Sequence, residues 1–189
     1  MMAADDTLAT QQAFRVLLQA LSHPGEIYLL SPGDPGQGLP LLLQTLLDHE
    51  VGFAVIGPDG EACAGLVREW TKAPLTEVPG ADFIIVTDGN SRGGLLQAKR
   101  GTLEYPDQGA TIIYLVESLG ARGNAGSRLN LQGPGINEEM QTNISGLAAA
   151  EIFDLKKINQ EFPLGVDCFF LDTAGRVMGL PRSTQLEVQ

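Results

Sequence analysis

The chain has 189 residues, of which 12 are basic and 23 acidic, so its formal charge is −11. At about 150 residues per domain this length predicts one compact domain over residues 1–189, with a core that needs no disulfide or metal. The acidic balance disfavours binding to nucleic acid, which depends on basic surface. The N-terminus lacks a signal-peptide pattern and no apolar run approaches the ~18 residues of a membrane span, so we expect a cytoplasmic protein without membrane contact.

Most familiar catalytic and metal-binding patterns are absent from the sequence. The two histidines, His23 and His49, do not have metal-ligand spacing, and there is no Gly-Lys phosphate loop and no G-x-S-x-G elbow. Cys63 and Cys168 lie in apolar segments far apart, where buried free thiols are the simpler interpretation and a disulfide or metal pair is the alternative. The residues therefore predict no metal, no cofactor and no catalytic group in this chain.

Hydrophobic periodicity predicts strands that alternate with helices through the first two thirds of the chain. Helices are expected over residues 7–22, 41–48, 59–70 and 91–100, strands over 26–30, 51–56, 81–87, 110–116 and 127–131, and a surface loop over 31–40. A long helix is expected over 143–160, followed by a β-hairpin whose strands are 166–171 and 176–180. This order predicts an α/β fold, a single layered domain with a mixed sheet flanked by helices.

A glycine turn precedes the expected long helix. Gly133 and Gly135 follow a strand, where backbone N–H groups can face an anion at a helix N-terminus, although a plain connecting turn is the alternative. Glu138 and Glu139 would then suit the positive end of the helix dipole.

The last predicted strand is followed by side chains that suit phosphate or carboxylate. Arg182, Ser183 and Thr184 group a guanidinium with two hydroxyls. A structural salt bridge is the alternative role for Arg182. His23 lies in the segment Ser-His-Pro-Gly that ends the first predicted helix, so it is best explained as a helix-terminal residue.

Five ordered blocks resemble one known family. They lie within residues 14–25, 101–111, 129–136, 162–167 and 181–187, and include Phe14-Arg15-x-Leu17-Leu18, Phe162-Pro163-Leu164-Gly165-x-Asp167 and Pro181-Arg182-x-Thr184. The family is PhnH, the H subunit of the bacterial carbon–phosphorus lyase core complex. The similarity runs from about Phe14 to Glu187.

The resemblance implies a fold similar to pyridoxal-phosphate-dependent transferases but without that cofactor. It implies a homodimer when alone, and an accessory subunit that joins the G, I and J subunits. It further implies that their assembly converts an alkylphosphonate and ATP to ribose 1-phosphonate 5-triphosphate and adenine, which leads to C–P bond cleavage, while this chain supplies no proven catalytic residue.

The alternative function is a stand-alone phosphonate- or nucleotide-phosphate-binding protein or transferase. The cleft of such a protein would be lined by residues that can bind an anion. We choose these residues by their chemistry and not by a family assignment: Arg15, Arg182, Ser183, Thr184, Gly133 and Gly135. Two or three charge-assisted contacts of ~1.5–3 kcal/mol each are enough for micromolar to millimolar binding.

Overall fold

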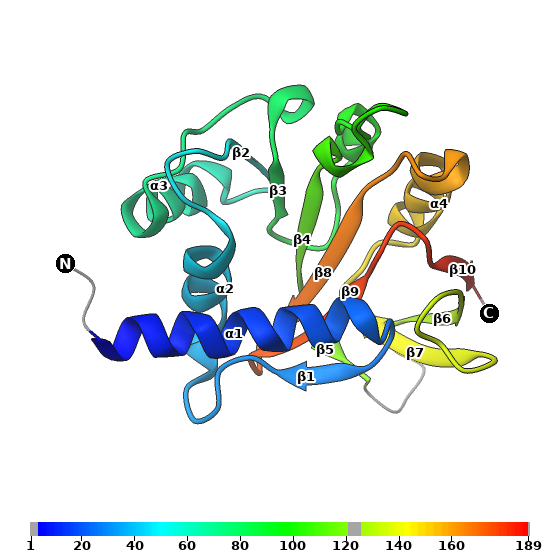
Figure 1. The fold of residues 1–189 in the computed structure, drawn as a ribbon, viewed down its shortest axis with the longest axis horizontal. Coiled ribbons are helices and arrows are strands. Elements are labelled where there is room, and N and C mark those ends of the chain that lie inside the picture. The colour runs from blue at the N-terminus through cyan, green and yellow to red at the C-terminus, as the bar shows by residue number, and fades with distance from the viewer. Residues whose placement is uncertain (1–3, 121–125, 189) are drawn as a thin grey trace.

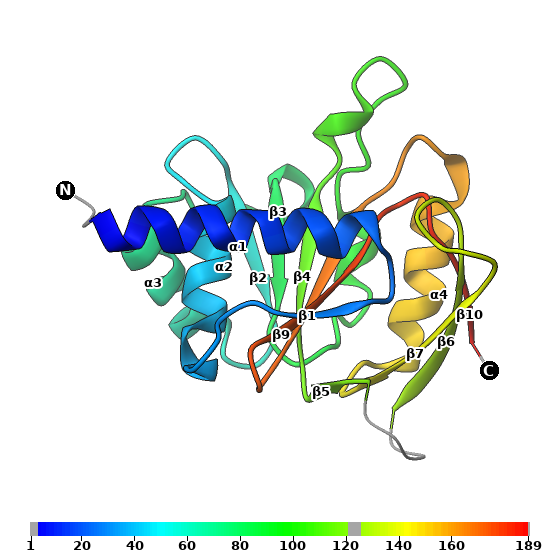
Figure 2. The ribbon, with the colours of Figure 1, turned by 60° about the horizontal axis from the view of Figure 1, so that its bottom comes forward.

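The computed structural model describes residues 4–120 and 126–188, and within them the chain forms three layers (Figures 1 and 2). The helices are α1 (Ala4–Ser22), α2 (Gly38–Leu46), α3 (Gly60–Thr71) and α4 (Ala149–Ile158). The strands are β1 (Ile27–Leu29), β2 (Phe53–Ile56), β3 (Phe83–Val86), β4 (Thr111–Val116), β5 (Ser118–Leu119), β6 (Ser127–Gln132), β7 (Met140–Ser145), β8 (Asp167–Asp172), β9 (Arg176–Leu180) and β10 (Gln185–Val188). No helix of the described ranges is long and apolar enough to cross a membrane.

A six-stranded mixed sheet is the middle layer, in the order β1-β9-β8-β4-β3-β2. Strands β2, β3, β4 and β8 are parallel, whereas β9 and β1 are antiparallel to their neighbours. The parallel strands are continuous apolar runs because both of their faces are covered. This mixed sheet with helices confirms the α/β class.

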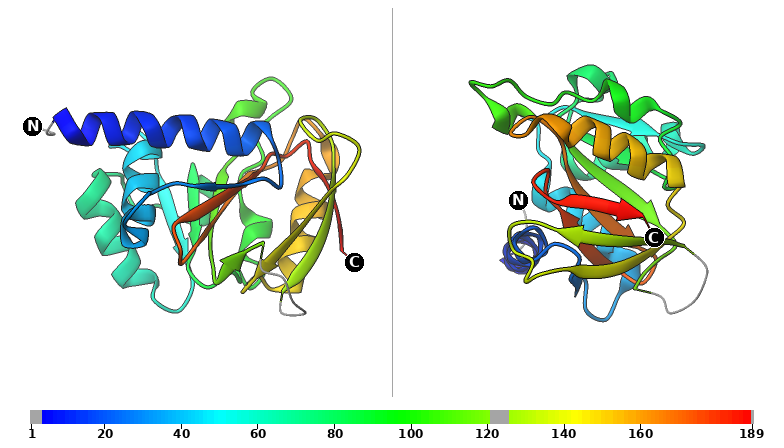
Figure 3. Two further views of the ribbon diagram at one scale, coloured as in Figure 1. Left: turned by 90° about the horizontal axis from the view of Figure 1, so that it is seen from below. Right: turned by 90° about the vertical axis from the view of Figure 1, so that its right-hand side faces the viewer.

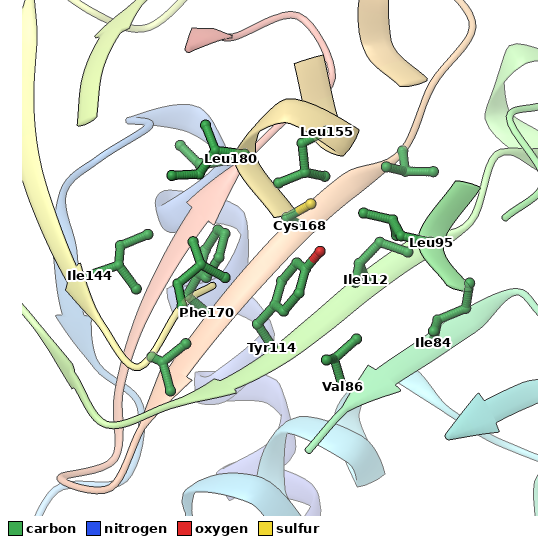
Figure 4. Close-up of a cluster of buried hydrophobic side chains, with 14 of the residues drawn as sticks. Ile84, Val86, Leu95, Ile112, Tyr114, Ile144, Leu155, Cys168, Phe170 and Leu180 are labelled. Carbon is green, nitrogen blue, oxygen red and sulfur yellow. The ribbon is translucent and has the colours of Figure 1, made fainter. Parts of the chain in front are cut away.

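The two faces of this sheet pack against different partners. Residues such as Ile85, Ile113 and Phe169 point toward α1, α2 and α3. Alternate residues point the other way, toward α4 and a second sheet, where Tyr114 and Phe170 stack with ring centroids 5.1 Å apart (Figure 4). The large sheet therefore lies between two hydrophobic cores.

The second sheet is antiparallel, has the order β10-β6-β7-β5 and was not expected from the sequence. The predicted helix over 143–160 is wrong in its first part, because Met140–Ser145 is strand β7 and the helix spans only Ala149–Ile158. In β7 the buried side chains Thr142 and Ile144 alternate with more exposed ones, and Gly146 at φ +81° separates strand from helix. The glycine turn therefore joins two strands, and Glu138 and Glu139 precede a strand instead of a helix.

Smaller differences have local causes. The predicted helix over 91–100 is only a 3₁₀ turn at Gly94–Gln97, because Arg92 and Gly93 both have positive φ. The loop over 31–40 contains a 3₁₀ turn at Pro35–Gln37, and α2 already begins at Gly38. The closing β-hairpin and the strands predicted over 51–56, 81–87 and 110–116 are confirmed, with ends shifted by up to two residues.

Candidate functional site

Arg182 follows β9 and is held by Asp167 at the start of β8. The β8–β9 register pairs Cys168 with Leu180, which places Asp167 beside the chain that leaves β9. Arg182 Nη2 donates to Asp167 Oδ2 at 2.6 Å, its backbone N–H donates to Oδ1 at 2.8 Å, and Nη1 donates to the Pro106 carbonyl at 2.5 Å. The guanidinium, whose side chain is 12% exposed, thus has the structural salt bridge that the sequence offered as one of two roles.

Ser183 and Thr184 pack against the glycine turn between β6 and β7. A Cβ added at Gly133 would lie 3.0 Å from the Ser183 carbonyl oxygen, in a backbone conformation with φ +143° that favours glycine. Thr184 is 6% exposed, and its Oγ1 has no hydrogen-bond partner among the residues described. Buried hydroxyls in proteins are normally hydrogen-bonded, so Thr184 Oγ1 is an exception, and the oxygen atom is itself buried.

These residues line a pocket of about 570 Å³ between α4 and β10. Its lining residues are Pro134, Leu155, Lys156, Asn159, Gln160, Phe162, Arg182, Ser183, Thr184, Gln185, Leu186 and Glu187. The last turn of α4 and the chain after it form one wall, and β10 with the preceding loop forms the other. Figure 3 shows β10 between α4 and β6 when the molecule is viewed from its right-hand side. A volume of this size is within the range of ligand-binding sites.

The positive charge available in this pocket comes from Lys156. Arg182 is already neutralised by Asp167, whereas the exposed Lys156 has no ion pair with any described residue. Glu187, next to the buried Leu186 on β10, also lines the pocket, so an acidic residue accompanies the Lys156 ammonium group there. The pocket therefore combines one free ammonium group, the Asn159 and Gln160 amides and an apolar floor.

Asn159 shapes the turn below the pocket. Its side-chain Nδ2 donates to the Val166 carbonyl at 3.1 Å, and its Oδ1 accepts from the Val166 N–H at 2.8 Å. A Cβ at Gly165 would meet the same Asn159 side chain. The amide thereby joins the end of α4 to the start of β8 and fixes the chain that carries Phe162.

Arg15, Gly135 and His23 lie outside the pocket lining. Arg15 is exposed on α1. Gly135 (φ +83°) packs against the Ser22 carbonyl and Pro24 at the end of that helix. His23 Nδ1 lies 3.2 Å from the Gln19 carbonyl oxygen, as expected for a helix-terminal residue. The structure thus brings Arg182, Ser183 and Thr184 together with the turn at Gly133, and it does not bring Arg15 or Gly135 to them.

The sequence treated Lys156 as a solvated charge and did not single out Asn159 or Gln160. These three residues have spacings of three and four positions and therefore share one side of a helix. That spacing lies within the predicted helix over 143–160 and was the available signal, but the sequence did not indicate that β10 lies opposite these residues.

A second polar cluster lies in the core, around a fully buried carboxylate. Glu151 Oε1 accepts from the Ser91 N–H at 2.7 Å and from Ser91 Oγ at 2.9 Å, and its Oε2 accepts from the Tyr114 hydroxyl at 2.6 Å. Burial raises the pKa of Tyr114 well above its usual range. This cluster satisfies its own hydrogen-bonding groups and joins α4 to the large sheet.

Both cysteines are free thiols. Cys168 is buried on β8, and burial raises its pKa well above the usual value. Cys63 on α3 is partly buried, and its pKa is also raised by burial and by the nearby Asp59. Within the described ranges, no group of three His, Cys, Asp or Glu residues is arranged to hold a metal ion.

Comparison with known proteins defines the class of this chain. Residues 2–187 match the PhnH family, described as bacterial phosphonate metabolism protein. HtxG of Stutzerimonas stutzeri, described as a C-P lyase subunit, is 35% identical over 185 residues, which cover 95% of this chain and 86% of HtxG. A second relative, the alpha-D-ribose 1-methylphosphonate 5-triphosphate synthase subunit PhnH of Rhizobium meliloti (strain 1021), is 31% identical over 196 residues, covering 97% of this chain and 93% of the relative. The chain belongs to the PhnH family, as the sequence blocks predicted.

Proposed function

We propose that this chain is an accessory subunit of a carbon–phosphorus lyase complex. The complex would convert an alkylphosphonate and ATP to ribose 1-phosphonate 5-triphosphate and adenine, which leads to C–P bond cleavage. The observation that carries the proposal is family membership over nearly the whole chain, together with two relatives that are matched over most of their length and are both named as subunits. The partners proposed are G-, I- and J-type subunits, and a second copy of this chain when it is alone.

A surface with little charge, here called the α1–α2 face, supports a role in assembly. Residues 7–22 and 38–46 carry one charged side chain, Arg15, in a chain that is 19% charged. Phe14 and Leu18 are each 49% exposed on this face, and Leu8 is 52% exposed. An open hollow of about 630 Å³ lies between the two helices. Depletion of charge and exposed apolar side chains are typical of the centre of a protein interface.

Affinity purification tests the proposal with matched variants. The tagged chain is expressed in phosphonate-grown cells with the genes for G-, I- and J-type subunits, and their recovery is measured for the wild type, Leu18→Glu and Leu66→Glu. Leu66 on α3 is exposed to nearly the same degree as Leu18 but lies off the α1–α2 face. We expect Leu18→Glu to reduce either subunit recovery or self-association, and Leu66→Glu to reduce neither. Recovery of the wild-type chain as a lone monomer contradicts the proposal.

The proposal also covers the domain organisation, the cellular location and the fold of the chain. We propose one folding domain over residues 1–189, in the cytoplasm, with a sheet similar to that of pyridoxal-phosphate-dependent transferases. The mixed sheet of β2, β3, β4, β8, β9 and β1 supports the likeness. The cofactor is not expected to bind: Lys99 is paired with Asp82, Lys72 Nζ donates to the Glu69 carbonyl, and Lys156 and Lys157 lie on α4. Absence of a new absorption band on titration with pyridoxal phosphate supports this expectation, and a stable imine contradicts it.

A small anion in the pocket is the second candidate function, a stand-alone binding protein or transferase. The observation in its favour is that Lys156, Ser183 and Thr184 line one pocket. The Asp167 carboxylate opposes it by neutralising Arg182. Calorimetric titration of the isolated chain with methylphosphonate and with ATP tests this candidate function. Binding at millimolar ligand supports it, and no binding at that concentration contradicts it.

A further inference from the structure

A loop over residues 101–109, here called the 101–109 loop, projects from the molecule just before β4. Figure 2 shows it in green, extending beyond the large sheet and the helices that cover it. At its tip Leu103 is 77% exposed, more than any other large apolar side chain in residues 4–120 and 126–188, and Tyr105 is 54% exposed. Exposed apolar side chains that are scattered singly over a surface are ordinary, but these two belong to one turn at the end of a projection.

Hydrogen bonds hold the tip of this loop in one conformation. The backbones of Thr102 and Tyr105 exchange two hydrogen bonds of 3.1 Å, and Thr102 Oγ1 accepts from the Tyr105 N–H at 3.0 Å. A Cβ at Gly101, where φ is +76°, would lie 2.8 Å from the Tyr105 carbonyl oxygen, so the turn packs back on its own base. A tip that is already ordered loses less conformational freedom on binding than a flexible one would.

The base of the loop is joined to the body of the protein. Arg100 and Gly109 form an isolated antiparallel bridge, and the Arg100 carbonyl accepts from the Gly165 N–H at 3.0 Å. The Pro106 carbonyl accepts from the Arg182 guanidinium at 2.5 Å. The loop is therefore a fixed projection, held by the chain that precedes β8 and by the chain that follows β9.

The unpaired charges on the tip have one sign. Glu104 lies between the two apolar residues and Asp107 follows in the next turn; both are exposed, and neither has an ion pair with any residue described. Arg100 at the base is paired with Glu161, with 3.7 Å between Nη1 and Oε2. The tip thus presents apolar side chains beside carboxylates that are not neutralised. A surface complementary to it is an apolar recess with basic residues at its rim.

We infer that the 101–109 loop inserts its tip into an apolar recess with a basic rim on a partner subunit. This inference rests on the proposed function, because it names a contact through which this chain joins the other subunits. The charges favour a different protein over a second copy, since this chain has 23 acidic and 12 basic residues and would meet the acidic tip with a surface of the same sign. Five of its basic side chains are moreover already paired with carboxylates, namely Arg92, Lys99, Arg100, Arg176 and Arg182.

The test uses two substitutions at the tip, each with a matched control on α3. Leu103→Ala removes the most exposed apolar side chain, and Leu66→Ala makes the same change at another exposed leucine. Glu104→Lys reverses a charge at the tip, and Glu69→Lys reverses an exposed carboxylate of α3. All four side chains are exposed, so the variants should unfold at the wild-type temperature. The affinity of each full-length variant for the purified G-, I- and J-type subunits is measured at low and at high salt.

We expect the affinity to fall by about tenfold for Leu103→Ala and for Glu104→Lys, and by less than about twofold for the controls. The wild-type affinity should decrease as salt is added, and Glu104→Lys should weaken this dependence because salt screens the attraction that the substitution removes.

Two results separate the inference from the proposed function. A wild-type complex that assembles, with both tip variants binding as tightly as the wild type, overturns the inference and leaves the proposed function standing. Failure of the wild type to assemble overturns both together. Tip variants that weaken self-association of the isolated chain without changing its affinity for the subunits identify a second copy as the partner, and this also overturns the inference.

Discussion

Asp167 and Arg182 face each other across the base of the closing hairpin, and together they join three separated parts of the chain. The carboxylate accepts from the Arg182 backbone and from its guanidinium, which also reaches the Pro106 carbonyl. The β10 strand begins three residues after Arg182, so the ion pair fixes the direction in which the chain enters the small sheet. The pocket wall thereby depends on a contact that is itself mostly shielded from water.

Breaking this pair is expected to destabilise the protein. Arg182→Met leaves Asp167 partly buried without its counter-charge, and we expect the free energy of unfolding to fall by about 2–3 kcal/mol in urea titrations. The control is Arg92→Met, which breaks the exposed pair with Asp88 on a surface loop and should change stability little. Equal effects of the two substitutions would show that Asp167 and Arg182 do not have the structural role assigned to them.

The buried carboxylate of Glu151 provides a second prediction. Tyr114→Phe keeps the ring that stacks on Phe170 but removes the hydroxyl that donates to Glu151 Oε2. One oxygen of a fully buried carboxylate then lacks a donor, and we expect a loss of about 1–3 kcal/mol in the free energy of unfolding. Tyr28→Phe removes a hydroxyl that donates to the exposed Glu26, and should cost much less. Chemical denaturation at neutral pH measures both.

Two glycines with similar backbone angles should respond differently to alanine. Gly33 (φ +94°) has open space where a Cβ would lie, whereas Gly135 (φ +83°) faces the Ser22 carbonyl oxygen at the end of α1. Both substitutions impose a left-handed conformation on alanine, costing about 1–2 kcal/mol, but Gly135→Ala also requires the β6–β7 turn to move away from α1. Thermal unfolding should show a larger decrease in Tm for Gly135→Ala, and a larger decrease for Gly33→Ala is incompatible with the turn as described.

The buried Cys168 thiol is expected to make the protein less stable at alkaline pH. Burial raises its pKa in the folded protein, so between the unfolded pKa of about 8.5 and the higher folded pKa the unfolded chain has lost a proton that the folded chain keeps. The thiol contributes fully to the free energy of unfolding below pH ~8.5, and this contribution is lost as the pH rises. For this one group the free energy of unfolding falls by at most about 1.4 kcal/mol per pH unit. Urea titrations from pH 7.5 to 9.5 should show the decline in the wild type and a shallower one in Cys168→Ala. Parallel declines in both proteins contradict this assignment.

The large sheet was predictable because its signals are local. Asp172-Thr-Ala-Gly175 separates two apolar runs, and in the structure Asp172 Oδ1 accepts from the N–H groups of Ala174 and Arg176, as turn chemistry requires. The β-branched apolar runs at β2, β3 and β4 are typical of strands covered on both faces. These features do not depend on where the rest of the chain lies.

The small sheet was missed because its strands, apart from β6, which matches the strand predicted over 127–131, resemble other structures in isolation. Strand β7, Met-Gln-Thr-Asn-Ile-Ser, has few apolar residues, and Ile144 happens to have helical spacing from residues of α4. Strand β10 has four residues and is defined by its pairing with β6. The pocket could not be foreseen for the same reason, since one of its walls is β10, which was not predicted as a strand.

Native mass spectrometry of the chain co-expressed with G-, I- and J-type subunits tests the central claim most directly. The account predicts one dominant species in which this chain is present with all three partners at a fixed stoichiometry, and the isolated chain as a dimer. A spectrum in which the partners assemble without this chain, while it remains free at the same concentrations, would contradict it.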